Sequence, residues 1–262
     1  MRFAVSNIAW DAAHDELMHQ KLPILGYTGL EIAPTRVFPH LPYSNLSAVA
    51  DWRRTLQEEY SLMVPSMQSI WYGRSEKLFG SDEERAVLLD YTKQAVDFAE
   101  AAGCRNLVFG CPKNRVVMTS EDYGRGIDFF RHIANYAELH STVIGLEANP
   151  VIYGTNYINT TQEALELLRE ADRPGLQLNL DVGTMVANEE SAKLLIGNVR
   201  HISHVHISEP YLKPIEERPL HKELAELLRS EGYAGFVSVE MGKVEDLTVL
   251  YEIMAYVREI FG

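Results

Sequence analysis

The fold is decided by one stretch, Thr142-Val143-Ile144-Gly145-Leu146-Glu147-Ala148-Asn149-Pro150. Its apolar run has the length of a strand, and it ends in the carboxylate of Glu147 shortly before Asn-Pro. Such a run is typical of a strand buried on both faces, as in a parallel sheet. An ionised carboxylate left alone in a low-dielectric site costs several kcal/mol, so Glu147 needs a positive partner, and a metal ion is the simplest candidate.

The same pattern recurs in three later stretches, which end near Asp181, His206 and Glu240. Successive members of this set of four are separated by 34, 25 and 34 positions, the length of a strand, a helix and two loops. In a barrel of parallel strands, such strand ends lie side by side on one face. We therefore expect the four side chains to form one site.

Hydrophobic periodicity along the chain predicts eight strands that alternate with eight helices. The connections are long enough for right-handed crossovers and no GxGxxG motif follows the first strand, so we expect an α/β fold, a (β/α)8 TIM barrel, rather than a doubly wound sheet. With 262 residues, the chain fits a single domain over residues 1–262. The remaining strands are expected over about residues 2–6, 29–34, 61–68 and 105–110, and the helices over about residues 11–21, 46–60, 81–102, 120–140, 160–173, 189–196, 222–230 and 245–261.

The composition, with 46% hydrophobic and 23% charged residues, is that of a soluble globular protein. A formal net charge of −13 argues against a nucleic-acid partner, because affinity for a phosphate backbone comes from Lys and Arg. No apolar leader opens the chain and no run of about 18 apolar residues occurs in it, so we expect a cytoplasmic protein with no membrane partner. A homo-oligomer is left open. Cys104 and Cys111 flank one predicted strand, which holds them too far apart for a disulfide, so both are expected as buried thiols.

Two glutamates, one aspartate and one histidine make a mixed set of hard oxygen and imidazole ligands. This set suits one divalent cation, with manganese as the first choice and magnesium, cobalt or zinc as alternatives. We expect alternation along the strand to point only one of His204 and His206 into the barrel. His206 is chosen because it is nearer the carboxyl end, where active sites of this fold lie. Glu31, at the end of the second strand, fits equally a salt bridge inside the barrel mouth or a substrate contact.

Further candidate substrate contacts follow the third and fourth strands. Gln68 ends the third strand, and Trp71 and Tyr72 come next; the aromatic pair fits either a sugar-stacking wall or plain packing. Lys113 and Arg115 form the only basic pair placed at the mouth. They either hold a phosphate or carboxylate of the substrate or are solvated loop residues.

Four motifs resemble the sugar-phosphate isomerase/epimerase family of xylose isomerase-like TIM barrels, which includes ketose 3-epimerases, hydroxypyruvate isomerase and inosose dehydratase. The resemblance extends over essentially the whole chain. Its most specific motifs are Gly145-Leu146-Glu147-Ala148-Asn149-Pro150, Leu180-Asp181-Val182-Gly183, His204-Val205-His206-Ile207-Ser208-Glu209 and Gly232-Tyr233-Ala234-Gly235-Phe236-Val237-Ser238-Val239-Glu240-Met241. The resemblance implies one divalent metal held by Glu147, Asp181, His206 and Glu240, with the two glutamates as the acid/base pair of the epimerase branch.

The implied chemistry is consistent with these residue types. A metal that bridges a carbonyl and the neighbouring hydroxyl acidifies the carbon between them and stabilises an enediolate. One carboxylate removes the proton; its return from the opposite face gives epimerisation, and its return to the adjacent carbon gives isomerisation. We therefore expect a metal-dependent isomerase or epimerase that acts on a small carbohydrate-like molecule: a sugar, a sugar phosphate or a hydroxy-carbonyl compound.

Three positions depart from the ketose 3-epimerase pattern, because Thr184, Leu212 and Tyr153 stand where those enzymes have His, Arg and Glu. The resemblance therefore does not carry over their sugar specificity. The substrate contacts expected from this half of the chain are Asn149, Glu209 and His221.

Three other functions are open at this point. An inosose dehydratase-like lyase would use the same site. An apurinic-site endonuclease-like metallohydrolase would need a three-metal cluster with extra histidines on the early strands and a less acidic chain. A barrel that keeps the metal and binds a ligand without turnover is the non-enzymatic alternative, and exchange of solvent protons into a bound ketose separates it from an isomerase.

Overall fold

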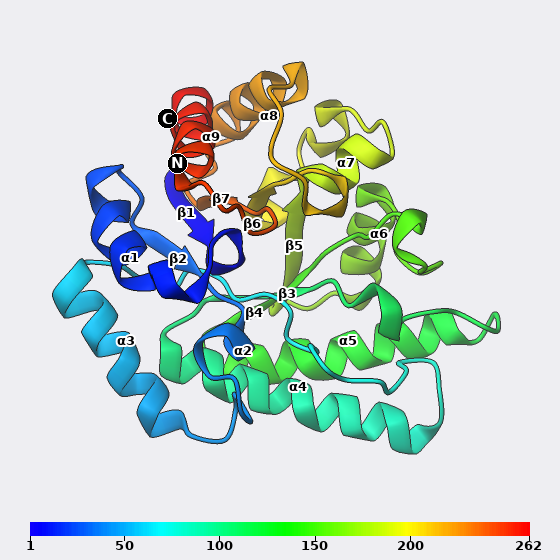
Figure 1. The fold of residues 1–262 in the computed structure, drawn as a ribbon. Coiled ribbons are helices and arrows are strands. Elements are labelled where there is room, and N and C mark those ends of the chain that lie inside the picture. The colour runs from blue at the N-terminus through cyan, green and yellow to red at the C-terminus, as the bar shows by residue number, and fades with distance from the viewer.

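Seven parallel strands form one curved sheet at the centre of the molecule, and helices surround it (Figure 1). The computed structural model describes residues 1–262. The strands lie in the order β2-β1-β7-β6-β5-β4-β3, and every pairing is parallel. Their bounds are β1 Arg2–Ser6, β2 Gly29–Glu31, β3 Asn106–Phe109, β4 Val143–Leu146, β5 Leu176–Asp181, β6 Ile202–Ile207 and β7 Phe236–Val239.

The segment expected as the third strand, residues 61–68, lies between β2 and β3 and closes the barrel. It makes only isolated parallel bridges, in which Met63 pairs with β2 and Met67 pairs with β3. Pro65 interrupts the ladder because it has no backbone N–H to donate. Two backbone hydrogen bonds of 2.9 and 2.8 Å still join Met67 to β3. The predicted TIM barrel is therefore confirmed, with one of its eight strand positions irregular.

Nine α-helices cover the outside of the barrel. Their bounds are α1 Asp15–Ile24, α2 Pro34–Val37, α3 Leu46–Tyr60, α4 Asp82–Ala102, α5 Asp122–Leu139, α6 Thr161–Ala171, α7 Val182–Ala187, α8 Pro219–Ser230 and α9 Leu247–Phe261. Capping boxes at Ser81 and Thr160 start α4 and α6, and Gly103 ends α4 with a left-handed φ of 65°. None of these helices combines the length and the apolar character needed to cross a membrane.

The helix predicted over residues 189–196 is wrong. A short helix, α7, instead begins directly after β5, because the side chain of Asp181 accepts a hydrogen bond from the backbone N–H of Thr184 at 3.0 Å and caps it. Glu189 has a left-handed φ of 54°, which interrupts the helical path, and residues 192–195 form a separate 3-10 helix. The short helix α2 was not predicted either; it begins at Pro34, a residue favoured at the first helical position.

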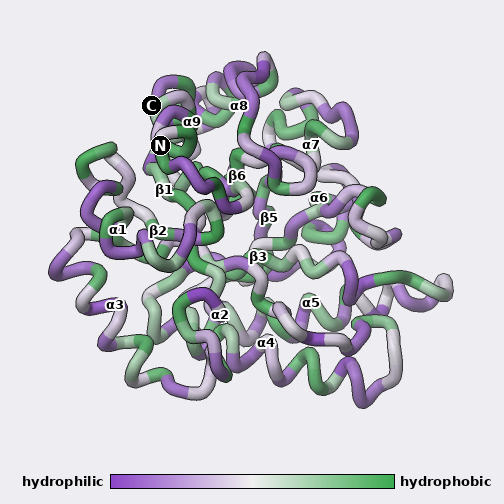
Figure 2. Tube along the Cα trace, viewed as in Figure 1, coloured by the Kyte–Doolittle hydropathy of each residue, from purple (hydrophilic) through white to green (hydrophobic).

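Hydrophobic side chains between the strands and the helices form one cluster of 67 buried residues. Figure 2 shows hydrophobic and hydrophilic residues alternating along the surrounding helices, as expected for amphipathic helices on a barrel. The inside of the barrel is polar by contrast. Asn106 of β3 donates to Asn179 of β5 at 3.3 Å, and Ser203 of β6 donates to Asn106 at 2.7 Å. A hydrogen-bonded polar column therefore fills the space between the strands.

The two cysteines are free thiols, as expected. Cys104 is buried and Cys111 is half-buried. Burial raises the pKa of both thiols to about 12. Because the thiolate is the form that binds metals and attacks electrophiles, neither side chain is suited to either role at neutral pH.

Candidate metal and active site

The carboxyl ends of β4 to β7 bring the four predicted ligands together. Asp181 of β5 and His206 of β6 are register partners on neighbouring strands. His206 Nδ1 lies 3.3 Å from Glu147 Oε2 and 3.2 Å from Glu240 Oε2. Ligand atoms of Glu147, Asp181 and His206 all lie within 4.8 Å of one another. Residues spread over more than 90 positions of sequence thus form one compact polar cluster at the barrel mouth.

Two asparagines orient the carboxylate of Glu147. Asn149 Nδ2 donates to its Oε1 and Asn179 Nδ2 donates to its Oε2, both at 2.9 Å. Gly110, just after β3, permits this placement, since a Cβ there would lie 2.7 Å from Glu147 Oε1. Asn149 was predicted as a substrate contact, whereas Asn179 was missed. The signal for Asn179 was its position two residues before Asp181, on the same face of the strand.

Arg115 lies behind this carboxylate rather than at the mouth. Its side chain is fully buried, and its Nη2 donates to the backbone oxygen of Glu147 at 2.8 Å and to Asn149 Oδ1 at 2.6 Å. Burial lowers the pKa of Arg115 to about 10. The predicted basic pair is therefore split: Lys113 is exposed, whereas Arg115 is neither solvated nor available to a substrate. Its role is to hold the segment that carries Glu147.

Three carboxylates share the cluster with one imidazole. Burial and the charges of Glu147 and Glu240 raise the pKa of Asp181 to about 7. Burial also raises the pKa of Glu240, although His206 opposes this shift. Burial alone would lower the pKa of His206, but the carboxylates of Glu240 and Glu31 raise it well above its usual range. A protonated imidazole therefore supplies the positive charge at the centre of the cluster.

This donor set fits a divalent cation. Ligand atoms of Glu147, Asp181 and His206 lie within 4.8 Å of one another, and Glu240 adjoins this group through His206 Nδ1; such a set of oxygens and one imidazole nitrogen matches the ligand preference of manganese and related ions. Burial is the largest cause of the raised pKa values of Asp181 and Glu240, and the neighbouring carboxylates add to it, so a bound cation would favour the ionised forms of both. Both hydrogen bonds to the Asp181 carboxylate, from Ser208 Oγ at 2.6 Å and the Thr184 N–H, go to Oδ1, so Oδ2 has no protein donor.

Both histidines of β6 point into the barrel, so the prediction that only one does is wrong. Residues two apart on a strand share a face, and alternation therefore separates His204 from Val205 and not from His206. Glu31 Oε2 lies 2.8 Å from His204 Nε2 and 2.9 Å from His206 Nε2, with all three side chains buried. Of the two roles open for Glu31, a salt bridge or a substrate contact, the structure shows the salt bridge. Because Glu31 contacts Nε2 of His206, the other ring nitrogen, Nδ1, faces Glu147 and Glu240.

Gln68 and Trp71, which follow the third strand position, are both buried. Gln68 Nε2 donates to Ser6 Oγ at 2.8 Å inside the barrel. Trp71 is buried, and its ring meets that of Phe109 at a centroid distance of 4.6 Å. Trp71 therefore packs in the core instead of forming an exposed sugar-stacking wall. Tyr72 is the exposed member of the aromatic pair.

Glu209 and His221 stabilise the segment between β6 and α8. Both carboxylate oxygens of Glu209 accept hydrogen bonds of 2.6 Å from Arg218. His221 lies within α8 with its Nδ1 2.9 Å from the hydroxyl of Tyr256, and burial lowers its pKa to about 4. Both side chains thus have partners within the protein, and their predicted contact with a substrate stays a prediction.

At the rim of the site, Tyr153, one of the departures from the epimerase pattern, contacts Tyr211, the residue before a second departure, Leu212. The hydroxyl of Tyr153 accepts a hydrogen bond from the backbone N–H of Tyr211 at 2.7 Å, and the two rings meet edge to face at 5.6 Å. Burial raises the pKa of Tyr153, and the charges of Asp181 and Glu240 add to this shift, whereas the hydrogen bond from the Tyr211 N–H opposes it. Tyr211 and Leu212 have left-handed φ values of 63° and 54°. The rim is aromatic and apolar where ketose 3-epimerases carry charged groups.

Metal uptake is expected to release protons. In the metal-free protein, Asp181 is protonated below about pH 7 and His206 carries a second proton, and a cation would displace both. The raised pKa of Asp181 means that its contribution to the stability of the metal-free protein is lost as the pH rises toward about 7. We therefore expect the affinity for Mn²⁺, and the rise in Tm that Mn²⁺ causes, to increase between about pH 5.5 and 7.5.

Isothermal titration in two buffers of different ionisation enthalpy gives the number of protons released. Asp181→Asn is the control, and it should release fewer protons than the wild-type protein. A proton count of zero with a pH-independent affinity would contradict this prediction.

The sequence profile of the xylose isomerase-like TIM barrel family matches residues 22–259. The chain therefore belongs to this family. The resemblance found in the motifs is confirmed. The matched region contains the four predicted ligands, Glu147, Asp181, His206 and Glu240, which we call the acidic cluster.

Individual relatives include an isomerase and two sugar epimerases. A human protein provisionally described as a hydroxypyruvate isomerase is 27% identical over 170 residues, and the match covers 60% of each chain. The chain thus spans 60% of the length of this curated relative. A 3-keto-D-glucoside 4-epimerase from E. coli superposes with a TM-score of 0.80 at 22% identity, covering 99% of both chains. A D-psicose 3-epimerase from Clostridium cellulolyticum H10 superposes with a TM-score of 0.80 at 16% identity, covering 100% of this chain and 99% of the other.

Proposed function

We propose that the protein is a divalent-metal-dependent isomerase or epimerase of a sugar, a sugar phosphate or a small hydroxy-carbonyl compound. The observation that carries the proposal is the convergence of Glu147 and Glu240 on the same nitrogen of His206, at 3.3 and 3.2 Å, with Asp181 beside them. Two carboxylates that approach one position from different strands are what the removal and return of a proton require. The names of the relatives support the same reaction class.

Glu147, Asp181, His206 and Glu240 would hold the cation. When bound, the cation would supply positive charge beside the carbonyl oxygen of the substrate and so acidify the adjacent C–H. The chain's own residues perform the proton transfer. Asn149 and Asn179 fix the direction of the Glu147 carboxylate, while Glu240, whose pKa burial raises, can carry a proton at a pH where an exposed glutamate cannot.

The rim indicates what kind of substrate is accepted. Tyr153 and Tyr211 offer ring faces and one engaged hydroxyl, and Arg115 is withdrawn into the interior. The remaining predicted cation, Lys113, is exposed. An uncharged sugar or hydroxy-ketone therefore suits the rim better than a phosphorylated substrate.

Deuterium uptake tests this function. The Mn²⁺-loaded protein is incubated in D₂O with free ketoses, ketose phosphates and small hydroxy-keto acids, and incorporation at carbon is followed by NMR and mass spectrometry. Exchange with a change of configuration indicates an epimerase, and exchange with carbonyl transposition indicates an isomerase. Loss of water from the substrate would assign a dehydratase-like lyase. Binding of a ketose without any exchange would overturn the proposal in favour of a ligand-binding barrel.

A further inference from the structure

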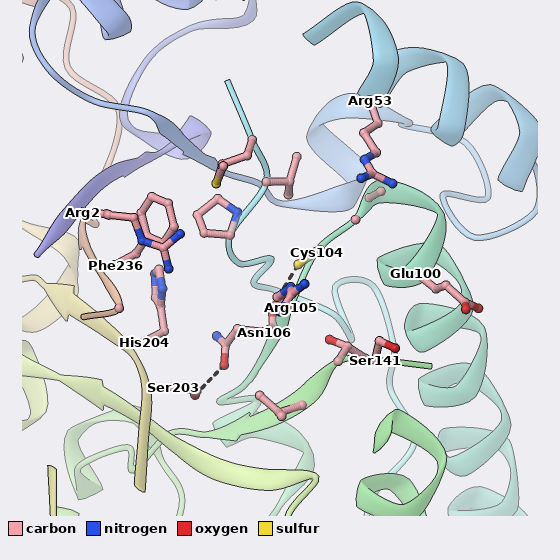
Figure 3. A pocket seen from close by; sticks show the side chains of 18 of the residues that line it. Arg2, Arg53, Glu100, Cys104, Arg105, Asn106, Ser141, Ser203, His204 and Phe236 are labelled. Atoms are coloured by element: carbon pink, nitrogen blue, oxygen red, sulfur yellow. Dashed lines mark hydrogen bonds between the residues drawn. The ribbon is translucent and has the colours of Figure 1, made fainter. Parts of the chain in front are cut away.

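A cavity of about 1050 Å³, shown in Figure 3, opens at the amino-terminal end of the barrel strands. It is lined by the first residues of β1, β3, β4, β6 and β7 and by the second residue of β5, whereas the acidic cluster lies at the carboxyl ends. The amino-terminal end of such a barrel normally serves stability rather than chemistry. A hollow of this size is at the upper end of ordinary ligand sites.

Three arginines line this cavity: Arg2 of β1, Arg53 of α3 and Arg105 just before β3. Their guanidinium groups make no ion pair or hydrogen bond with the rest of the chain, whereas the adjacent Arg54 pairs with Asp51. Figure 3 shows Arg2 on one side of the cavity and Arg53 and Arg105 on the other. In a chain of net charge −13, three cations without partners around one hollow leave a local excess of positive charge.

The acidic and polar groups of the lining leave that charge available. Glu100 is the one carboxylate in the lining, and its Oε2 already lies 2.7 Å from His140 Nδ1. Thr142 is buried, and its hydroxyl has no hydrogen-bond partner. That oxygen is closed off from solvent, so the arginines are the donors that this cavity offers to a ligand.

The wall also has an apolar side. The guanidinium carbon of Arg2 lies 4.2 Å from the ring centroid of Phe236, and Leu62, Val64 and Pro65 complete this surface. The cavity is much larger than an inorganic anion needs. The lining therefore matches a molecule that carries both an anionic group and an apolar or flat body.

We propose that this cavity binds a phosphate-bearing organic molecule. Guanidinium groups present paired N–H donors that match phosphate oxygens, and a phosphate can accept from several of them together. Arg53 and Arg105 supply the cations for the phosphate, and the apolar side of the cavity, formed by Leu62, Val64 and Pro65 beside the pair of Arg2 and Phe236, covers the body of the ligand. Arg53 and Arg105 are separate from Glu147, Asp181, His206 and Glu240, so binding of the phosphate requires neither the metal nor the proposed reaction.

Phenyl phosphate is the probe for the test, because it combines a phosphate with a flat ring. Its binding to the full chain is measured by isothermal titration at low ionic strength, with Mn²⁺ present. We expect one saturable site, and the double variant Arg53→Gln/Arg105→Gln should bind at least about tenfold more weakly. Arg54→Gln is the matched control, one residue along α3 and outside the cavity, and its affinity should equal that of the wild-type protein. Glu147→Gln should also bind normally, because the probe does not enter the acidic cluster.

Circular dichroism and Tm establish that each variant is folded. If the double variant does not fold, Arg105→Lys replaces it; that change keeps the charge but removes the guanidinium fork, and a several-fold loss is expected. Absence of saturable binding by the wild-type protein would overturn the proposal. Equal affinity in the double variant, or equal losses in Arg54→Gln and the double variant, would overturn it as well.

Discussion

Glu147→Gln and Glu240→Gln are each expected to lower turnover by about 10²- to 10⁴-fold, the usual worth of a positioned acid or base. An amide cannot take up the substrate proton. It is also a weaker ligand than a carboxylate for a hard divalent cation, so metal occupancy should fall. In Glu147→Gln, the new side chain would present an N–H₂ group to Asn149 or Asn179, whose own amide groups donate to the native carboxylate at 2.9 Å. Elemental analysis and deuterium exchange measure the two effects separately.

Glu245→Gln is the matched control for this pair of variants. Glu245 is exposed on the segment that follows β7, five residues after Glu240, and its loss should change neither occupancy nor turnover. Normal metal content together with normal exchange in both Glu147→Gln and Glu240→Gln would remove this cluster as the active site.

His206→Ala is expected to cost more than His204→Ala in both stability and metal binding. Truncation of His206 removes the imidazolium that lies 2.9 Å from Glu31 and 3.2 Å from Glu240, and a buried charge left without its partner costs about 3–5 kcal/mol. His204 contacts Glu31 but none of the other carboxylates, so its truncation should cost about 1–3 kcal/mol and leave the metal bound. Urea unfolding gives the free energies, and elemental analysis of the folded fraction gives the metal content.

The reverse result would be informative. If His204→Ala loses the metal while His206→Ala keeps it, the cation is held by the deeper group of Glu31 and His204 rather than by Glu147 and Asp181. In that case Glu31 and His204 would hold the cation without His206, although ligand atoms of all three lie within 4.8 Å of one another.

The positions of the four strand ends could be predicted because parallel strands place their carboxyl ends on one face, and the spacing of Glu147, Asp181, His206 and Glu240 follows from that rule. The orientation of His204 could also have been predicted, since alternation puts residues two apart on the same side. The partner of both histidines was harder to find. Glu31 lies 175 positions before His206, and only closure of the barrel brings the two within 2.9 Å.

The burial of Arg115 could not be predicted from the sequence. An arginine in a loop after a strand resembles a solvated residue, and nothing near it in sequence indicates burial. Its environment is built by Glu147 and Asn149, more than 30 positions later. One role of Asp181 was also missed. It was predicted only as a ligand, but its side chain also caps α7, so this helix begins earlier than predicted. The sequence pattern around Asp181 indicated the ligand role and not the capping role.

The turn formed by Tyr211 and Leu212 loses its conformational freedom when the protein folds, and not when a substrate binds. Tyr211 and Leu212 both adopt left-handed backbone conformations, which cost about 1 kcal/mol or more each in residues other than glycine. The hydroxyl of Tyr153 accepts from one of these residues, and the backbone N–H of Gly242 donates to the carbonyl of the other at 2.7 Å, so strands β4, β6 and β7 jointly fix this turn. Its loss of conformational freedom occurs when the barrel folds. A ligand that meets this wall therefore keeps a larger share of its contact energy as affinity.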